Sequence, residues 1–505
     1  MSKSSDKNKK RTKTYAHRKT WTATDKFLHI SGWTVAGIQL AVTGIFAAFL
    51  QYIGMIPFDY KLLIGALLIM LSIFTLVTQH WKITGIITKI VSLMISAVLV
   101  VGCIYIGSTR NALGNISGNS MHRTEIGVYV LEDSEAQSME DIIDKSFGIN
   151  KTTDRINTDK AINEINERYE CNIATVEYDD SIALAAGLYS GETDAVILNS
   201  AYINMIEENE NYQDFEEKIR LITTITYDND VVNDNNENYL SGDGIFTMYI
   251  SGIDTNGEPT VNRNSDVNIL MTVNTNTHQI LMINTPRDFY VPTTVSGGMR
   301  DKLTHAGCYG IDCSVGTLEM LYETNIDYYL KVNFTGFVDI INLLGGIEVY
   351  SETEFTTWNG GYHIAAGTNY LNGEEALGFA RERYAFGSGD RQRGKNQMKV
   401  IKAVINKMLS ADMLMNYTQI LDAVSSSMVT SMSYDEIGNL VKMQLDGMPS
   451  WNIQTYSVDG TGDNLPSYSL SSANYVMVPD ETTVAQAKAY LAAVYDNQII
   501  DTGTQ

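Results

Sequence analysis

The chain has 505 residues, enough for about three domains of ordinary size, and it carries 36 basic and 59 acidic residues. Hydrophobic residues make up 44% and aromatic residues 10%, which excludes wholesale disorder. Four cysteines are too few for a disulfide scaffold, and the acidic balance argues against non-specific binding of nucleic acid.

The charge divides the chain into a basic head and an acidic body. Residues 1–110 hold 13 basic and 3 acidic residues, and the remainder holds 23 basic and 56 acidic residues. The head contains three long runs without a charged residue, at 27–58, 62–81 and 90–109. One such run could be a buried core helix, but three in succession predict transmembrane helices within 27–109, since about 20 residues cross a membrane.

The loops around these runs predict the orientation in the cell membrane. Nine basic residues precede residue 27, and the loop between the second and third runs carries Lys82 and Lys89 but no acid. The positive-inside rule therefore predicts a multi-pass protein with a basic cytoplasmic tail at 1–26 and with residues 110–505 outside the cell. We expect the helices to anchor the protein rather than to transport a solute, because no motif in them suggests a transport site.

The outer part begins with an accessory α/β domain and linker, predicted at 110–242. Strand-like segments at 127–131, 171–178 and 194–200 alternate with helical patterns at 139–147, 158–169 and 182–188. The polar stretch 228–238 predicts a linker. No glycine-rich phosphate loop or catalytic cluster occurs here, so a partner-binding role is the default.

A second outer domain is predicted at 243–475, followed by a C-terminal tail at 476–505. The pattern predicts a strand at 245–254, a hairpin of strands 267–274 and 278–285, and helices at 313–324, 334–344, 373–381 and 392–409. Four apolar strand residues are expected either to pack in the core or to line an apolar slot: Ile269, Met271, Leu281 and Ile283.

Residues 381–399 form a cationic island, with six basic and two acidic residues. Asp390 suits the N-cap of the helix that follows, and Arg393 and Gln397 share one face of its first two turns. Because helix N-termini favour anions and arginine binds them bidentately, this pattern predicts a phosphate site. Arg381 and Arg383 could meet the same anion if the preceding helix ends between them. A solvated surface patch is the alternative.

Two acids and two cysteines are further candidates. Asp254 ends the first strand of this domain and Asp266 precedes the second, so neighbouring strands can bring them together. Paired carboxylates beside arginines suit Mg²⁺ that also holds a phosphate oxygen, although an isolated Asp is more often a turn former. Cys308 and Cys313 could form a disulfide outside the cell. The sequence leaves this question open, because Cys171 makes the number of cysteines predicted outside the cell odd.

Seven segments resemble the LytR-CpsA-Psr (LCP) family of bacterial cell-envelope enzymes: SGIDT, SDVNILMTVN, INTPRDFYV, DKLTHA, VNFTGFVDIINLLGGIEV, LNGEEALGFARERY and DRQRGKNQ. They cover about residues 243–410, and the three membrane runs and the extra outer domain resemble the CpsA-type branch, linked to capsular polysaccharide. The resemblance implies an α/β fold with a central mixed sheet flanked by helices and with an apolar pocket for a polyprenyl lipid.

The resemblance also implies an activity, which is the Mg²⁺-dependent transfer of a capsular polysaccharide or similar anionic wall polymer from a polyprenyl-pyrophosphate carrier to peptidoglycan. By motif, Asp254 and Asp266 are metal-side acids, catalytic together with Arg381 and Arg383, and Asp254 is a candidate general base. The implied pyrophosphate-binding set is Arg263, Arg287, Lys302, Arg381, Arg383, Arg393 and Gln397. The family usually has arginine two residues before the second acid, where this chain has Asn264 and places Arg263 one residue earlier.

Other functions remain open at this point. The rivals are a membrane regulator of polysaccharide synthesis or transcription, and a non-catalytic module that binds the lipid carrier. A side pyrophosphatase activity would accompany the enzyme. The expected partners are the lipid-linked polymer, peptidoglycan, membrane lipid and, through the accessory domain, polysaccharide-synthesis proteins, with no nucleic acid. The N-terminal tail is too short for a DNA-binding domain, which favours the enzyme.

Overall fold

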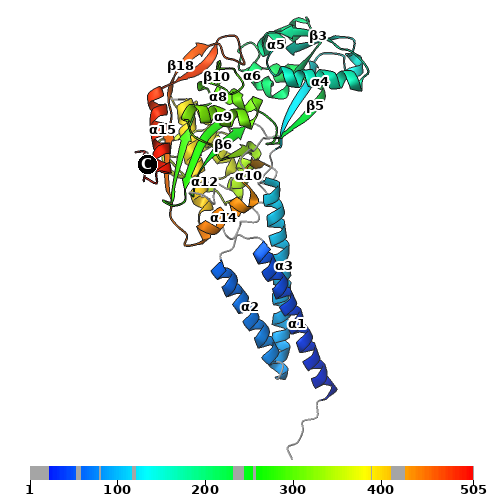
Figure 1. Cartoon of the computed structure of the whole chain (residues 1–505), viewed down its shortest axis with the longest axis vertical. Coiled ribbons are helices and arrows are strands. Elements are labelled where there is room, and N and C mark those ends of the chain that lie inside the picture. Colours follow the sequence, from blue (N-terminus) through cyan, green and yellow to red (C-terminus); the bar gives the residue numbers. More distant parts are fainter. Residues whose placement is uncertain are drawn as a thin grey trace, which may run out of the picture. The chain divides into compact units, whose positions relative to one another are not determined.

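The computed structural model describes residues 22–52, 58–78, 81–116, 121–230, 244–253, 258–387, 389–410 and 427–503. The chain divides into two compact units, Met1–Gly107 and Ser108–Gln505, and Figure 1 labels some of the elements of each. The first unit contains α1 (Ala23–Tyr52), α2 (Phe58–Thr78) and most of α3 (Lys82–Ile116). Their apolar stretches, Lys26–Gln51, Phe58–Thr78 and Ile83–Ile104, have mean hydropathies of 1.7, 2.2 and 2.3. These lengths and compositions suit membrane anchoring and agree with the three runs expected from the sequence.

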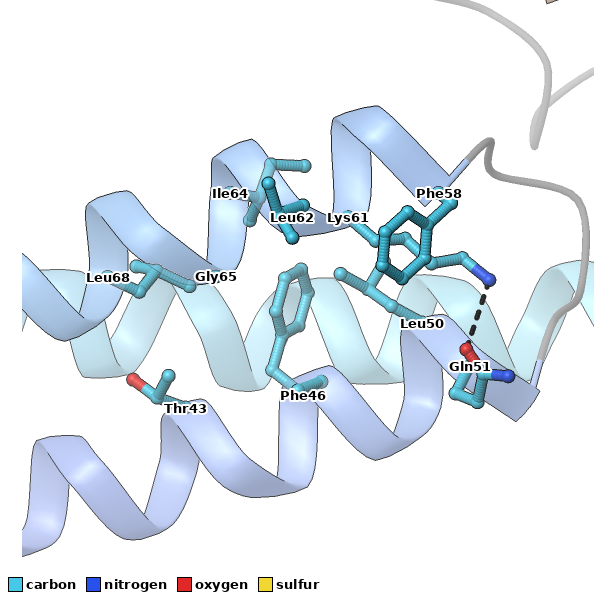
Figure 2. A pocket seen from close by; sticks show the side chains of 11 residues that line it. Thr43, Phe46, Leu50, Gln51, Phe58, Lys61, Leu62, Ile64, Gly65 and Leu68 are labelled. Atoms are coloured by element: carbon cyan, nitrogen blue, oxygen red, sulfur yellow. Dashed lines mark hydrogen bonds between the residues drawn. The ribbon is translucent and has the colours of Figure 1, made fainter.

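Polar contacts join the three helices of the first unit. The side-chain oxygen of Gln39 on α1 accepts hydrogen bonds from Ser92 of α3 at 2.6 Å and from Thr75 of α2 at 3.4 Å. A cavity of about 190 Å³ lies between α1 and α2, with a hydrogen bond of 3.3 Å from Lys61 to Gln51 at one end (Figure 2). Buried hydrogen bonds such as those to Gln39 hold helices together where lipid provides no hydrophobic driving force.

The accessory domain of the second unit is built on a five-stranded mixed sheet in the order β3-β2-β4-β1-β5. Its strands are β1 (Met121–Leu131), β2 (Ser146–Asn150), β3 (Ala174–Tyr178), β4 (Ala195–Asn199) and β5 (Ile219–Asp230). Its helices are α4 (Arg155–Arg168), α5 (Ser181–Ser190), α6 (Ile203–Glu207) and α7 (Phe215–Lys218), with the short 3-10 turns η1 (Met139–Asp141) and η2 (Ser200–Tyr202).

Two expectations for the accessory domain need correction. The helix expected at 139–147 is absent: only η1 forms there, and β2 begins at Ser146. The cause is the sheet core, which buries Phe147 and Ile149 completely on alternate positions of β2. β5 continues to Asp230, so Asp228 belongs to a strand, and the rest of the expected linker lies outside the described residues.

The main domain has the expected central mixed sheet, in the order β16-β11-β6-β7-β8-β17. Its strands are β6 (Ile245–Ile253), β7 (Ser265–Asn274), β8 (Gln279–Asn284), β11 (Tyr328–Asn333), β16 (Met428–Thr430) and β17 (Asn452–Ser457). β6, β7 and β8 run antiparallel in sequence, so the expected hairpin is present, whereas β11 lies parallel to β6 and β17 parallel to β8.

Helices cover both faces of this sheet. On one face, Tyr249 and Leu281 pack with residues of α9 (Ile311–Tyr322) and α15 (Glu481–Tyr495). On the other, Met282 packs with residues of α12 (Asp390–Met408) and α14 (Tyr434–Leu445). The remaining elements are β9 (Tyr290–Pro292), β10 (Arg300–Lys302), α8 (Leu303–Ala306), η4 (Gly307–Tyr309), α10 (Phe334–Leu343), β12 (Ile347–Ser351), β13 (Phe355–Thr356), β14 (His363–Ile364), β15 (Gly367–Leu371), α11 (Gly373–Arg381), β18 (Gly460–Leu465) and β19 (Asn474–Pro479).

The C-terminal segment expected as a tail from residue 476 is folded. β19 pairs with β18, and α15 buries Val484, Leu491 and Val494 in the core on one sheet face. This segment therefore belongs to the main domain, because its helix covers apolar strand residues that water would otherwise reach.

The four apolar residues considered for a lipid slot do not share one face. Leu281 and Ile283 point toward α9 and α15, whereas Ile269 and Met271 pack on the side of α12 and α14. The hairpin register pairs Leu270, not Ile269, with Ile283, and side chains alternate between faces along a strand. Plain core packing is the correct interpretation for Leu281, Ile283 and Ile269, which are fully buried.

Candidate functional site

The candidate site lies at one edge of the main sheet, where β6, β8 and β11 end and β7 begins. This common edge follows from the strand directions, because β7 is antiparallel to both of its neighbours and β11 is parallel to β6. Asp266 is the second residue of β7, and Arg287 follows the end of β8 by three residues. Asp254 comes directly after β6 in the sequence but lies outside the described residues.

A β-bulge positions Asp266. Gly252 pairs with Val267 and Ile253 pairs with Ser265, so Asp266 is an extra residue in β7 without a partner in β6. Bulges re-aim side chains at sheet ends and next to active sites. The carboxylate of Asp266 accepts a hydrogen bond of 2.6 Å from the guanidinium of Arg287, so the structure brings these two expected residues together.

Lys302 lies beside Arg287 because β9 and β10 form an antiparallel pair in which Lys302 faces Tyr290. Both cations contact a carboxylate of the accessory domain: Glu208 lies 2.5 Å from the guanidinium of Arg287 and 2.6 Å from Nζ of Lys302. Asp288 lies 3.7 Å from Arg287 and 3.8 Å from Lys302. Glu208 and Asp288 were not expected from the sequence, although Asp288 stands in the motif that contains Arg287.

A buried histidine completes this cluster. Nδ1 of His305 lies 2.8 Å from Asp301, and Nε2 lies 3.5 Å from Glu208. Burial lowers the pKa of His305, but the charges of Asp301 and Glu208 outweigh that effect and raise the pKa to about 9. His305 is therefore a cation at neutral pH. His305 and Asp301 both stand in DKLTHA, four residues apart, whereas the contact of His305 with Glu208 could not be read from the sequence.

The arginine pair of ARER lies where a helix ends, as expected. α11 ends at Arg381, whose guanidinium lies 4.3 Å from the ring centre of Phe334, the first residue after β11. Arg383 is exposed and donates a hydrogen bond of 2.7 Å to the hydroxyl of Tyr384. Between them, buried Glu382 accepts hydrogen bonds from the backbone of Trp358 at 2.5 Å and Tyr384 at 2.7 Å. Glu382 thus fixes the loop that carries Arg383.

The first turn of α12 approaches the end of β8. Arg393 and Gln397 are buried on one face of the helix, as expected. Gly394 allows the approach, because a Cβ there would lie 2.3 Å from the side chain of Asn284. Arg393 is thereby placed near the strand end that leads to Arg287. The expected N-cap needs correction: Gly389 holds that position, and Asp390 is the first helical residue.

Two other charges of the cationic island form ion pairs with acidic side chains. Arg391 forms an ion pair of 2.5 Å with Asp459, and Lys399 pairs with Glu352. Arg263 forms an ion pair of 3.7 Å with Glu125 on β1 of the accessory domain. Cys308 and Cys313 are free and buried, so the disulfide left open by the sequence is not formed.

The chain's relationship to known proteins agrees with this site. The LytR_cpsA_psr family model matches residues 197–492, more than half of the chain. The chain belongs to the LytR-CpsA-Psr family. The family match begins in β4 and ends in α15, so it includes Glu208 and extends well beyond the 243–410 recognised from motifs.

Two curated relatives illustrate the similarity. A protein of Enterococcus faecalis named polyisoprenyl-teichoic acid–peptidoglycan teichoic acid transferase TagU is 34% identical over 220 residues, 43% of this chain and 71% of the relative. A protein of the same name from Bacillus mycoides is 34% identical over 197 residues, 39% of this chain and 63% of its own length.

Solved structures of similar proteins cover about half of the chain. The crystal structure of B. subtilis TagV matches with 28% identity and a TM-score of 0.43, over 51% of this chain and 99% of that one. Protein gbs0355 from Streptococcus agalactiae matches with 26% identity and a TM-score of 0.45, over 53% and 93%.

The LCP resemblance implies Mg²⁺ at this edge of the sheet, and Asp266 is the one of its two acids that the structure describes. Within the described residues, no group of three or more His, Cys, Asp or Glu side chains is arranged to hold a metal by itself. Mg²⁺ usually takes one or two carboxylates and completes its shell with water and phosphate oxygens. Asp266 offers one carboxylate, and Asp254 follows Ile253, whose partner Ser265 adjoins Asp266. The fit therefore depends on these two acids, as the LCP resemblance implied.

Proposed function

We propose that this protein is a membrane-anchored transferase that moves a wall glycopolymer from a polyprenyl-pyrophosphate carrier to peptidoglycan. The observation that carries the proposal is the meeting of Arg287, Lys302 and Asp266 at the sheet edge. Family membership supports it, since two relatives are named teichoic acid transferases. We propose a capsular polysaccharide or a similar anionic polymer as the cargo.

The cations supply what phosphoryl transfer needs. A hydroxyl of peptidoglycan attacks the phosphorus that bears the polymer, and the bond from that phosphorus to the bridging oxygen breaks, releasing polyprenyl phosphate. Arg287 and Lys302 bind the diphosphate and stabilise the negative charge that develops on its oxygens, with Arg381, Arg383, Arg393 and Gln397 as further proposed contacts. Mg²⁺, held by Asp254 and Asp266, would neutralise part of the same charge. Asp254 accepts the hydroxyl proton in this scheme.

Half-buried apolar side chains support a path for the lipid. On the sheet face toward α12, Met271 and Leu330 are only partly buried. Two residues of α12 that pack on this face, Ile401 and Ile405, are also half-buried. Fully packed cores leave few such positions, whereas lipid-binding sites are lined mainly by apolar groups.

The proposed topology places the site outside the cell. The basic tail lies in the cytoplasm, and residues 110–505 lie on the outer side, where peptidoglycan is found. Protease added to intact protoplasts should remove the outer body and spare the tail. A protected body would contradict this topology.

The activity is tested with the full-length protein in detergent, Mg²⁺ and a polyprenyl-pyrophosphate-linked saccharide. The proposal expects release of polyprenyl phosphate that increases when peptidoglycan fragments are added. Release that is independent of peptidoglycan would indicate a pyrophosphatase alone. Binding of the carrier without any release would indicate the non-catalytic module, and neither binding nor release would favour the regulator.

A further inference from the structure

Glu208 reaches the cation cluster from the accessory domain, on a segment that is firmly packed. It follows α6 directly, and Met205 and Ile206 of that helix are buried in a core that also includes Cys308 of the main domain. Sγ of Cys308 lies 3.4 Å from the carbonyl oxygen of Ala201. Packing thus fixes the approach of α6 to the main domain, so that Glu208 reaches the cluster from a defined direction.

The carboxylate of Glu208 divides its two oxygens between two cations. One oxygen lies 2.5 Å from the guanidinium of Arg287, and the other lies 2.6 Å from Nζ of Lys302. Burial raises the pKa of Glu208, but His305, Arg287 and Lys302 together hold the pKa well below its ordinary value. Glu208 therefore carries a full negative charge at neutral pH while only 18% of its side chain is exposed.

We propose that Glu208 is a built-in competitor of the substrate, occupying the place of one phosphoryl group between Arg287 and Lys302. This inference rests on the proposed function, in which these two cations bind the diphosphate. The N–H groups of Arg287 and Lys302 that now contact the two oxygens of the Glu208 carboxylate could equally bind two oxygens of a phosphoryl group. A phosphoryl group that took up these contacts with both cations would be strongly repelled by a Glu208 carboxylate that stayed in place.

The diphosphate must therefore displace Glu208. The diphosphate can do so because it carries more charge than one carboxylate and because Mg²⁺ and the arginines of the main domain add contacts. Displacement takes the side chain of Glu208 away from both cations, while Met205 and Ile206 keep α6 packed in its core. The apparent affinity for diphosphate is lowered by the fraction of molecules in which Glu208 fills the site.

A different role would have a different signature. If Glu208 were a permanent counter-ion that holds Arg287 and Lys302 in place, then removing its charge would leave two crowded cations and misplace them. Diphosphate affinity would fall, or stay unchanged, and the protein would lose stability. A competitor and a positioning group thus predict opposite changes in affinity.

The test is calorimetric binding of inorganic pyrophosphate to the full-length protein in detergent, with Mg²⁺ and at fixed salt. Glu208→Gln keeps the shape and removes the charge, and it should bind pyrophosphate about tenfold more tightly than wild type. Glu208→Asp keeps the charge but shortens the reach, so it should bind about threefold more tightly, which preserves the test if the Gln variant does not fold. The matched control is Glu207→Gln, because a glutamine at 207 can still accept the backbone hydrogen bond from Glu216.

Equal or weaker pyrophosphate binding by folded Glu208 variants would overturn the role of Glu208 and leave the proposed function standing. Failure of wild type and variants alike to bind pyrophosphate would contradict the anion site, and with it both proposals. Tighter binding by Glu207→Gln as well would overturn the specific role of Glu208.

Discussion

Asp301 and His305 form a fully buried ion pair next to Lys302. Their atoms Oδ1 and Nδ1 lie 2.8 Å apart, and neither side chain is exposed. Asp301 also accepts hydrogen bonds from the backbone N–H of Lys302 at 2.8 Å and from that of Ser469 at 3.1 Å. The pair thus fixes the backbone that presents Lys302 to the anion site, and it links the site's geometry to a titratable group.

The stability of this pair should depend on pH in a defined direction. The pKa of His305 in the folded protein, about 9, lies above its ordinary value of 6.5. The stabilisation from protonated His305 is therefore complete below about pH 6.5 and is lost as the pH rises through about 9. In thermal unfolding, wild type should have a higher Tm than His305→Gln, and this difference in Tm should shrink between about pH 7 and about pH 10. A difference in Tm that stays constant with pH would contradict the ion pair between His305 and Asp301. The control is His363→Gln, which changes an exposed histidine.

Arg393 should matter far more to turnover than its neighbour Lys395. Arg393 is buried on the helix face proposed to meet the diphosphate, whereas Lys395 is exposed on the same helix. Losing a charge-assisted contact costs about 1.5–3 kcal/mol, or about tenfold to a hundredfold in kcat/KM. Arg393→Ala should show that loss with its circular dichroism spectrum unchanged, and Lys395→Ala should resemble wild type. Equal activity of the two variants would remove Arg393 from the site.

The two acids should act as one metal site. Asp254→Asn and Asp266→Asn should each weaken binding of Mn²⁺, used as a spectroscopic stand-in for Mg²⁺, in the presence of pyrophosphate. The double variant should lose little more than the worse single variant, because residues that act as a unit are not additive. Asp459→Asn is the control, since Asp459 pairs with Arg391 instead. Unchanged Mn²⁺ binding in both single variants would place the metal elsewhere.

The C-terminal helix should be essential for stability. Leu491 on α15 is 3% exposed and packs in the core on one sheet face. Leu491→Ala should lower the free energy of unfolding by about 2–5 kcal/mol, as for other buried leucines. Lys488→Ala on the same helix removes only a surface ion pair of 2.8 Å with Glu323, so it should cost at most about 1 kcal/mol. Denaturant unfolding measures both, and similar losses would contradict the packing described for α15.

Local patterns in the sequence were sufficient for most elements but not for the centre of the site. Local patterns predicted a helix at 392–409, which corresponds to α12, and two strand-like segments joined by a short turn predicted the β7–β8 hairpin, because each signal is local in the chain. The prediction of a helix at 139–147 was wrong, because Phe147 and Ile149 belong to β2, an inner strand of the sheet, and are buried in the core. Burial by a distant strand overrides a helical spacing.

Long-range contacts account for what the sequence could not predict. Motif resemblance identified Arg287 and Lys302, but Glu208 lies 79 residues from the former and 94 from the latter along the chain. No spacing rule connects such positions, and only the packing of α6 against the main domain brings them together. The bulge at Asp266 is likewise set by its pairing with β6 rather than by a local pattern.

The most direct test of the transferase is attachment of a labelled lipid-linked glycopolymer to peptidoglycan by the full-length protein with Mg²⁺. The account predicts one polyprenyl phosphate released for each polymer attached, and a loss of about tenfold to a hundredfold in Arg287→Gln. Arg300→Gln, an exposed arginine that donates a hydrogen bond of 2.8 Å to the Tyr290 carbonyl, should retain activity. Attachment that survives the loss of Arg287, or a lipid carrier that stays intact with wild type, would contradict the account.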